Sequence, residues 1–125
     1  MADSTYPKHV RLRRKAEFTL VLSRGDAFPG RQALVRRVPN RLGHARLGLS
    51  TPRRYGNAVR RNLFRRLARE AFRAMRDELG GFDYLLSPRR HLDEPTLDGL
   101  GRDLLRTLTA TPAPPRGGSR RGRSR

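Results

Sequence analysis

The most informative part of the chain is residues 53–72, which read RRYGNAVRRNLFRRLAREAF. The apolar side chains in this stretch recur at helical spacing and continue to Leu79, so the pattern predicts a long amphipathic helix over residues 57–79. Asn57 is a suitable N-cap for this helix, and Gly80-Gly81 ends it. The predicted buried face comprises Val59, Leu63, Phe64, Leu67, Ala68, Ala71, Phe72, Met75 and Leu79.

The opposite face of the same helix is cationic. Arg61, Arg65 and Arg69 recur every four residues, and Glu70 is the only acid in the helix before Arg76. The helix N-terminus adds free N–H groups and the positive end of the helix dipole, both of which suit phosphate. This arrangement favours a structured RNA as the partner. A merely solvated face is the alternative, although such faces usually pair acidic with basic side chains.

Weaker patterns outside this helix predict the remaining elements. Residues 11–24 have helical spacing, and residues 32–38 and 45–50 alternate as strands. A hairpin is the economical connection between these two strands. Residues 82–87 indicate a third core strand, and residues 95–109 indicate a final helix with a stripe of leucines.

The charge of the whole chain supports a polyanionic partner. Over 125 residues, Lys and Arg number 29 and Asp and Glu number 11, which gives a net charge of +18. Only Lys8 and Lys15 are lysines, and the planar arginine fork binds phosphate and stacks on bases. A genome biased toward arginine codons also raises the share of arginine, but it does not explain the net charge. RNA, DNA and an anionic membrane are the candidate partners.

Length and composition exclude several classes of protein. The length fits one domain, and 35% hydrophobic residues allow only a small core. The absence of cysteine excludes disulfide scaffolds, thiolate zinc sites and cysteine nucleophiles. No apolar run is long enough to span a bilayer, so we expect a soluble protein of the cytoplasm with no membrane partner.

The chain divides into three predicted segments. Residues 1–10 show no periodicity and form a flexible N-terminus, and residues 11–110 form the folded domain. Residues 111–125 contain five arginines and no acid, so they are expected to be a disordered basic tail. Most of the net charge therefore belongs to the folded domain.

Three stretches of the chain resemble one known family. GNAVRRN (residues 56–62) followed by RRLAREAF (residues 65–72) is similar to the signature of the bacterial ribonuclease P protein component. RLGLSTPRRYGNAV (residues 46–59) resembles the strand and loop that precede that signature, and RLRRKAEFTLVLSRG (residues 11–25) resembles the N-terminal helix of the family. The resemblance covers roughly residues 8–109.

The resemblance implies an α+β fold. The expected structure is a single sandwich-like α/β domain with a central, mostly antiparallel sheet packed by helices. A left-handed β-α-β crossover is also expected, as in the second domain of one ribosomal protein, against the usual right-handed rule.

The resemblance also implies a function. Family members are subunits of a ribonucleoprotein endonuclease that matures the 5′ end of tRNA. They bind ribonuclease P RNA and the 5′ leader of precursor tRNA, and the catalytic centre lies in the RNA. We therefore expect no cofactor on the protein alone, Mg²⁺ in the RNA–protein holoenzyme, and a monomeric protein within it.

Two sets of site residues are carried over from the family. Expected contacts to ribonuclease P RNA are Arg53, Arg54, Asn57, Arg60, Arg61, Asn62, Arg65, Arg66 and Arg69. The expected leader-binding cleft includes Phe18, Leu22 and Arg36. Phe18 matches an aromatic residue of that cleft and can stack an unpaired base, although ordinary core packing is an equal alternative for it.

The sequence departs from the family at three of these positions. Leu63 replaces the second arginine of the usual Arg-Asn-Arg motif, and Arg60, which precedes the Arg-Asn pair, is a candidate to compensate. Arg60 projects on the apolar side of the helix, but its long side chain can still reach solvent from the first turn. Leu22 and Arg36 stand where the family often has aromatic residues. The cleft is therefore expected to depend less on stacking and more on phosphate contact.

No catalytic residue is expected in the protein itself. His9, His44 and His91 lack metal-ligand spacing, and no pair of carboxylates indicates a metal site. A ribosomal protein or another structural RNA-binding protein is the alternative, because small size and Arg-rich helices are common there. A DNA-binding helix-turn-helix is less consistent with the pattern, because a strand and a loop precede the basic helix.

Overall fold

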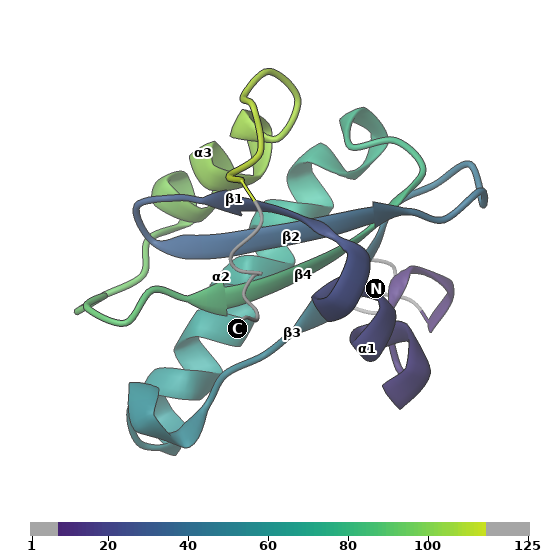
Figure 1. Ribbon diagram of the computed structural model, residues 1–125. Coiled ribbons are helices and arrows are strands. Elements are labelled where there is room, and N and C mark those ends of the chain that lie inside the picture. Colours follow the sequence, from purple (N-terminus) through teal and green to yellow (C-terminus); the bar gives the residue numbers. More distant parts are fainter. Residues whose placement is uncertain (1–7, 115–125) are drawn as a thin grey trace.

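The computed structural model describes residues 8–114, and Figure 1 shows how its elements are arranged. A four-stranded sheet is packed between helices. The strands are β1 (Asp26–Pro29), β2 (Ala33–Pro39), β3 (Arg46–Leu49) and β4 (Phe82–Pro88). The helices are α1 (Lys15–Arg24), α2 (Ala58–Met75) and α3 (Leu97–Arg106), with short 3-10 turns at Lys8–Val10, Arg53–Tyr55 and Arg76–Glu78.

The sheet is mixed, and its strand order is β1-β2-β4-β3. The β1/β2 and β2/β4 pairs are antiparallel, whereas β3 and β4 are parallel. Helix α2 connects the parallel pair. In Figure 1 both strands run toward the left, β4 lies above β3, and α2 passes behind the sheet, so the connection is left-handed. The expected fold, including its unusual crossover, is confirmed.

The predicted hairpin between residues 32–38 and 45–50 is wrong. Both segments are strands, but β4 lies between them and pairs with each. The loop that begins at Asn40 crosses the end of β4. Strand β3 therefore runs antiparallel to β2 but is not its neighbour in the sheet. Alternation of apolar and polar residues indicates a half-buried strand, but it does not indicate which strand pairs with it. The short connection between the two segments therefore led to the wrong pairing.

Strand β1 was not predicted, because its four residues end in a proline immediately before a turn. It forms one edge of the sheet, and β3 forms the other. Short bridges cover both edges: Ala113 pairs with Ala27 of β1, and Arg11 pairs with Leu47 of β3. Neither edge strand is therefore left fully open to pairing with another chain.

The main core lies between one face of the sheet and helices α2 and α3. The sheet contributes Val35, Leu47 and Leu86, among others, and α2 contributes Phe64 and Phe72. A second, smaller cluster lies on the opposite face, where Leu12, Val21 and Leu85 are buried beneath α1. Because neighbouring residues of β4 point to opposite faces, this strand contributes to both clusters.

Burial on α2 begins later than the sequence indicated. The buried residues of this helix are Phe64, Ala68, Ala71 and Phe72. Val59 was expected on the buried face, but 75% of its surface is exposed. The first turn of α2 extends beyond the core, and this leaves Arg61 partly exposed at the helix start.

The final helix is shorter than residues 95–109. Thr96 caps α3 by accepting a hydrogen bond from the Gly99 N–H at 3.0 Å, and Pro95 precedes the cap. Of the predicted leucine stripe, Leu100 and Leu104 are buried, whereas Leu97, Leu105 and Leu108 are 41–46% exposed.

The ends of the described region are held more firmly than the sequence indicated. Val10 belongs to the predicted flexible N-terminus but is buried, and the Leu12 N–H donates to the Leu47 carbonyl at 2.9 Å. At the other end, the Ala113 N–H donates to the Ala27 carbonyl at 2.7 Å, so the first residues of the predicted tail lie against β1. Residues 1–7 and 115–125, which include most of that tail, lie outside the described residues.

Candidate RNA-binding site

A corner between the Arg53–Tyr55 turn and α2 places the first group of predicted RNA-binding residues. Asn57 caps α2, because its side-chain oxygen accepts the Arg60 N–H at 3.0 Å. Tyr55 is buried and anchors the corner against Phe64, with ring centroids 6.0 Å apart. The side chains of Arg53 and Arg54 are exposed on this anchored turn. Two cations therefore lie immediately before a capped helix N-terminus, where anions bind readily.

The first two turns of α2 continue this cationic surface. Arg61 is held near the helix start, where its Nε donates to the Gly56 carbonyl at 3.2 Å. Arg65 donates through Nη1 to the Asn62 side-chain oxygen at 3.1 Å. Both hydrogen bonds use only part of a guanidinium group that has five donors. The remaining donors of both arginines can therefore bind phosphate in a fixed orientation.

Further along α2, the surface includes an acid. Arg66 forms an exposed i,i+4 ion pair with Glu70, at 3.7 Å. An exposed pair of this kind contributes little to stability and is easily exchanged for a phosphate contact. Arg69 lies one turn beyond Arg65 and is partly exposed. The predicted row of Arg61, Arg65 and Arg69 thus lies along one helix.

Arg60 is turned inward, unlike the other predicted RNA-binding arginines. Its guanidinium carbon lies 4.7 Å from the centre of the Tyr55 ring, and Nη2 donates to the Leu92 carbonyl at 2.7 Å. The Arg60 side chain therefore connects the start of α2 to the segment between β4 and α3. Arg60 thus projects on the apolar side, as the sequence indicated, but the expectation that it reaches into solvent is wrong, because the buried Tyr55 ring and the Leu92 carbonyl hold its guanidinium against the fold.

The predicted leader-binding residues share the face of the sheet that carries α1. Arg36 of β2 lies opposite Leu85 in the strand register, and Leu85 packs beneath α1 with Val21 and Phe18. Leu22 is 55% exposed on α1. Phe18 and Leu22 thus lie on α1, and Arg36 lies on the sheet face against which α1 packs.

Phe18 combines both roles that the sequence left open. It packs against the cluster of Leu12, Val21 and Leu85 but stays partly exposed. Gly48 of β3 lies directly beneath the ring, and a Cβ atom there would come within 2.8 Å of the Phe18 ring. A glycine at position 48 therefore lets the Phe18 ring approach β3 closely, while part of the Phe18 side chain stays exposed.

Arg36 brings an unneutralised charge to this face. Half-burial of its side chain lowers the pKa of the guanidinium below its ordinary value, but arginine remains charged at neutral pH. No ion pair joins Arg36 to a carboxylate among residues 8–114. A half-buried cation without an acid partner favours a phosphate ligand.

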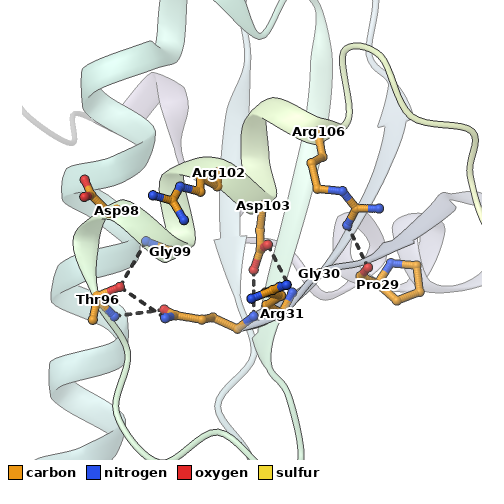
Figure 2. A pocket seen from close by; sticks show the side chains of 10 residues that line it. Pro29, Gly30, Arg31, Thr96, Asp98, Gly99, Arg102, Asp103 and Arg106 are labelled. Atoms are coloured by element: carbon orange, nitrogen blue, oxygen red, sulfur yellow. Dashed lines mark hydrogen bonds between the residues drawn. The ribbon is translucent and has the colours of Figure 1, made fainter.

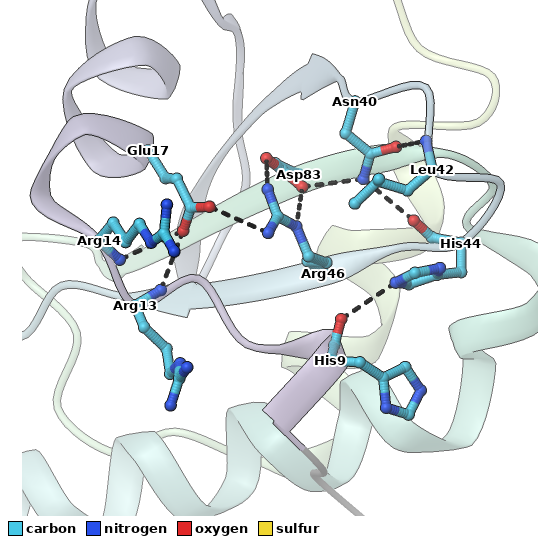
Figure 3. A network of polar contacts seen from close by, with 9 residues as sticks. All are labelled: His9, Arg13, Arg14, Glu17, Asn40, Leu42, His44, Arg46 and Asp83. Atoms are coloured by element: carbon cyan, nitrogen blue, oxygen red, sulfur yellow. Dashed lines mark hydrogen bonds and ion pairs between the residues drawn. The ribbon is translucent and has the colours of Figure 1, made fainter.

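A polar network that sequence reasoning missed fixes α1 against the sheet (Figure 3). The buried Asp83 carboxylate of β4 accepts two hydrogen bonds from Arg46 of β3, at 2.8 and 2.7 Å. Arg46 also donates to Glu17 of α1 at 3.0 Å. The Asp83 hydrogen bonds, opposed by partial burial, raise the pKa of Arg46. No sequence signal indicates this network, because its members are 29 and 37 residues apart.

The described residues contain no group of three His, Asp or Glu side chains that could hold a metal ion. The structure also has no helix, within residues 8–114, that is long and apolar enough to cross a membrane. The acids discussed above pair with arginines instead.

Fold and surface together define a small α+β RNA-binding protein, with a basic helix start on one side of the sheet and an open sheet face on the other. Comparison with known proteins identifies the family. The Ribonuclease P family model matches residues 6–111, and the chain belongs to this family. Its members are the protein components of the ribonucleoprotein that processes the 5′ ends of tRNA, in which the catalytic role lies with the RNA.

Individual relatives agree with this assignment. The chain is 34% identical to the ribonuclease P protein component of Chlamydia trachomatis serovar D over 109 residues, or 86% of this chain and 90% of the relative. A Thermotoga maritima RNase P protein structure matches with a TM-score of 0.70 and 31% identity, covering 81% of this chain and 99% of that one. A Staphylococcus aureus RNase P protein structure matches with a TM-score of 0.69 and 28% identity, covering 79% of this chain and 92% of that one.

Proposed function

We propose that this protein binds ribonuclease P RNA through the start of α2 and the 5′ leader of precursor tRNA through the sheet face beside α1. The observation that carries the proposal is the separation of two cationic surfaces by the sheet. Arg61 and Arg65 are fixed at the helix start, and Arg36 is half-buried on the other face. Two separate surfaces allow one protein to contact two RNA strands at once.

The leader surface suits an unpaired strand. The partly exposed ring of Phe18 can stack one base, a contact worth about 1–3 kcal/mol. Arg36 can bind the neighbouring phosphate, and Leu22 adds an apolar contact. Because this surface offers one aromatic ring and one cation, we expect it to bind leaders of many sequences.

The protein assists catalysis by binding and orienting RNA. We propose that Mg²⁺ acts in the holoenzyme and is held by the RNA, since the described protein residues provide no suitable group of ligands. We further propose that one copy of the protein acts per holoenzyme, in the cytoplasm where precursor tRNA is made.

Reconstitution tests this function. Purified protein is mixed with bacterial ribonuclease P RNA and a precursor tRNA with a 5′ leader, at an Mg²⁺ concentration where the RNA alone cleaves slowly. We expect faster cleavage with the protein, because its cations lower the repulsion between the two RNAs and so reduce the need for metal ions. The rate of appearance of the 5′ leader is the measurement.

Two controls make the result specific. A substrate with a leader of a single nucleotide should gain less from the protein, because it cannot reach the face that carries Phe18. Heat-denatured protein controls for a general effect of added cations. Cleavage no faster than with RNA alone, under all Mg²⁺ concentrations tried, contradicts the proposed function.

A further inference from the structure

A hollow of about 540 Å³ lies away from both surfaces described so far, between the β1–β2 turn and α3 (Figure 2). The β1–β2 turn contributes Pro29, Gly30, Arg31 and Gln32 to the lining. Helix α3 contributes side chains from its first three helical turns. The volume falls within the range of pockets that hold small ligands. Neither the sequence nor the proposed function assigns a role to this hollow.

The floor of the hollow is rigid because Asp103 is buried beneath the turn. Its carboxylate accepts the backbone N–H groups of Arg31, Gln32 and Ala33 at 3.1, 2.8 and 2.9 Å. Any side chain at Gly30 would overlap this carboxylate. The carboxylate oxygens of Asp103 are therefore already occupied by three amide donors within the fold.

A reciprocal pair of hydrogen bonds fixes one wall. The Gln32 side chain donates to the Thr96 hydroxyl at 3.1 Å and accepts the Thr96 N–H at 2.9 Å. The turn and the start of α3 are thus joined by groups whose polar atoms are already paired. The arginines that line the hollow beside this wall and floor are therefore the groups that remain available to a ligand.

Three arginines line the hollow: Arg31, Arg102 and Arg106. Arg106 donates to the Pro29 carbonyl at 2.9 Å, which holds it at one end. No ion pair or hydrogen bond joins the guanidinium of Arg31 or Arg102 to another residue in the described part of the chain. Asp98 is the remaining carboxylate of the lining and reduces, but does not cancel, the positive charge.

The hollow is connected to the RNA-binding start of α2. The segment between β4 and α3 begins beside it, where the Arg89 N–H donates to the Gln32 carbonyl at 2.9 Å. The same segment contacts α2 through Leu92, whose carbonyl accepts the Arg60 guanidinium. Arg89 and Arg90 are exposed along this segment. The segment also carries the exposed acids Asp93 and Glu94, so it joins the hollow to the start of α2 through hydrogen bonds and adds no net charge between them.

We propose that the hollow binds a backbone phosphate of ribonuclease P RNA, held by Arg31 and Arg102. The proposal rests on the proposed function, since it extends the RNA surface of α2. The guanidinium groups supply bidentate donors to the phosphate, and the hollow has room for the adjoining nucleoside. The Asp98 carboxylate repels the phosphate and therefore lowers the affinity of the site.

The test measures RNA affinity against salt concentration, with ribonuclease P RNA as the probe. Arg31→Gln/Arg102→Gln should lower the slope of log K against log salt by about 0.7–0.9, which is the contribution of one neutralised phosphate. Between about 50 and about 200 mM salt, the double variant should then lose about threefold less affinity than the wild type. Asp98→Asn should change affinity in the opposite direction and bind more tightly.

Arg41→Gln is the matched control. Arg41 is exposed in the loop that follows β2, whereas the hollow adjoins the turn that precedes β2, so its removal subtracts a charge without touching the hollow. Its slope should remain close to that of the wild type. Thermal unfolding of all variants should also remain unchanged, because the replaced side chains are exposed and without protein partners.

Each outcome separates this proposal from the proposed function. If the wild type stimulates cleavage but the double variant keeps the wild-type slope and affinity, the hollow does not bind RNA and the proposed function stands. If Arg41→Gln lowers the slope as much as the double variant does, the effect is one of overall charge and the site is refuted. If the wild type neither binds the RNA nor stimulates cleavage, both proposals fail.

Discussion

Arg60 and Arg65 lie five residues apart on α2 but serve different purposes. Arg60 packs on Tyr55 and donates to the Leu92 carbonyl, so it joins three segments of the fold. Arg65 remains at the surface, with Asn62 as its hydrogen-bond partner. The missing second arginine of the family motif, here Leu63, is therefore not replaced by the inward-facing Arg60.

This difference can be measured by replacing each arginine with methionine, which retains the apolar stem and a similar helix propensity. Arg65→Met should lower the salt slope of RNA binding by about 0.7–0.9 without affecting stability. Arg60→Met should lower the free energy of unfolding by about 1–3 kcal/mol, through the lost stacking and hydrogen bond, and leave the slope unchanged. Urea unfolding and RNA titrations at several salt concentrations give both quantities.

A reduced salt slope for Arg60→Met would show that its guanidinium leaves Tyr55 and contacts the RNA directly. An unchanged slope for Arg65→Met would instead support the solvated-face interpretation of α2. The two variants together therefore distinguish a positioning arginine from a binding one.

Helix α1 depends on Glu17 for its attachment to the sheet. Partial burial raises the pKa of Glu17, but the N–H groups of Arg14 and Arg13 and the Arg46 guanidinium outweigh it, so the pKa lies below its ordinary value of 4.5. A carboxylate with a lowered pKa stabilises the fold above its ordinary pKa. That contribution is lost as the pH falls through the lowered value.

Glu17→Gln should therefore be less stable than the wild type at neutral pH, by about 1 kcal/mol. The difference should shrink as the pH falls below 4.5 and the wild-type carboxylate becomes protonated. Urea unfolding across this pH range is the measurement, and Glu94→Gln, which changes an exposed acid, is the control. A difference that persists in strong acid would show that the charge of Glu17 is not its source.

At the scale of elements, sequence patterns predicted segments better than their neighbours. Helix α2 was predictable because an amphipathic pattern of this length has few alternative structures, and Asn57 marked its start correctly. Strand β1 was missed because four residues cannot establish alternation. The partners of β2 and β3 were misassigned because pairing with β4 depends on α2 returning the chain, which no local pattern records.

The candidate site was predictable only in part, for the same reason. The arginines of α2 lie on one helix, so their spacing in the sequence was enough to predict that they share a surface. Phe18, Leu22 and Arg36 were named from family resemblance, and only the three-dimensional fold shows that they share one face. The Arg46–Asp83–Glu17 network and the hollow above Asp103 join residues far apart in the sequence, and neither leaves a periodic signal.

For the whole molecule, the boundary of the folded domain can be tested by truncation. A chain ending at Pro114 should unfold like the full-length protein, because it retains the bridge between Ala113 and Ala27. A chain ending at Ala110 loses that hydrogen bond, so its free energy of unfolding should fall by about 1 kcal/mol with the fold intact. Thermal unfolding followed by circular dichroism compares the two. A large loss of stability in the longer chain would show that residues 115–125 contribute to the fold.

The position of β4 has a consequence for how this protein is made. The last strand to be synthesised lies inside the sheet, between two strands that do not touch each other. While the ribosome is still extending the chain, β2 and β3 have no shared partner, and the sheet cannot form until residues 82–88 have emerged. Because such non-local pairing forms late, α2 emerges with its arginines exposed before the sheet that positions this helix has formed. The nascent chain is therefore open to nonspecific contact with nearby RNA until β4 has emerged.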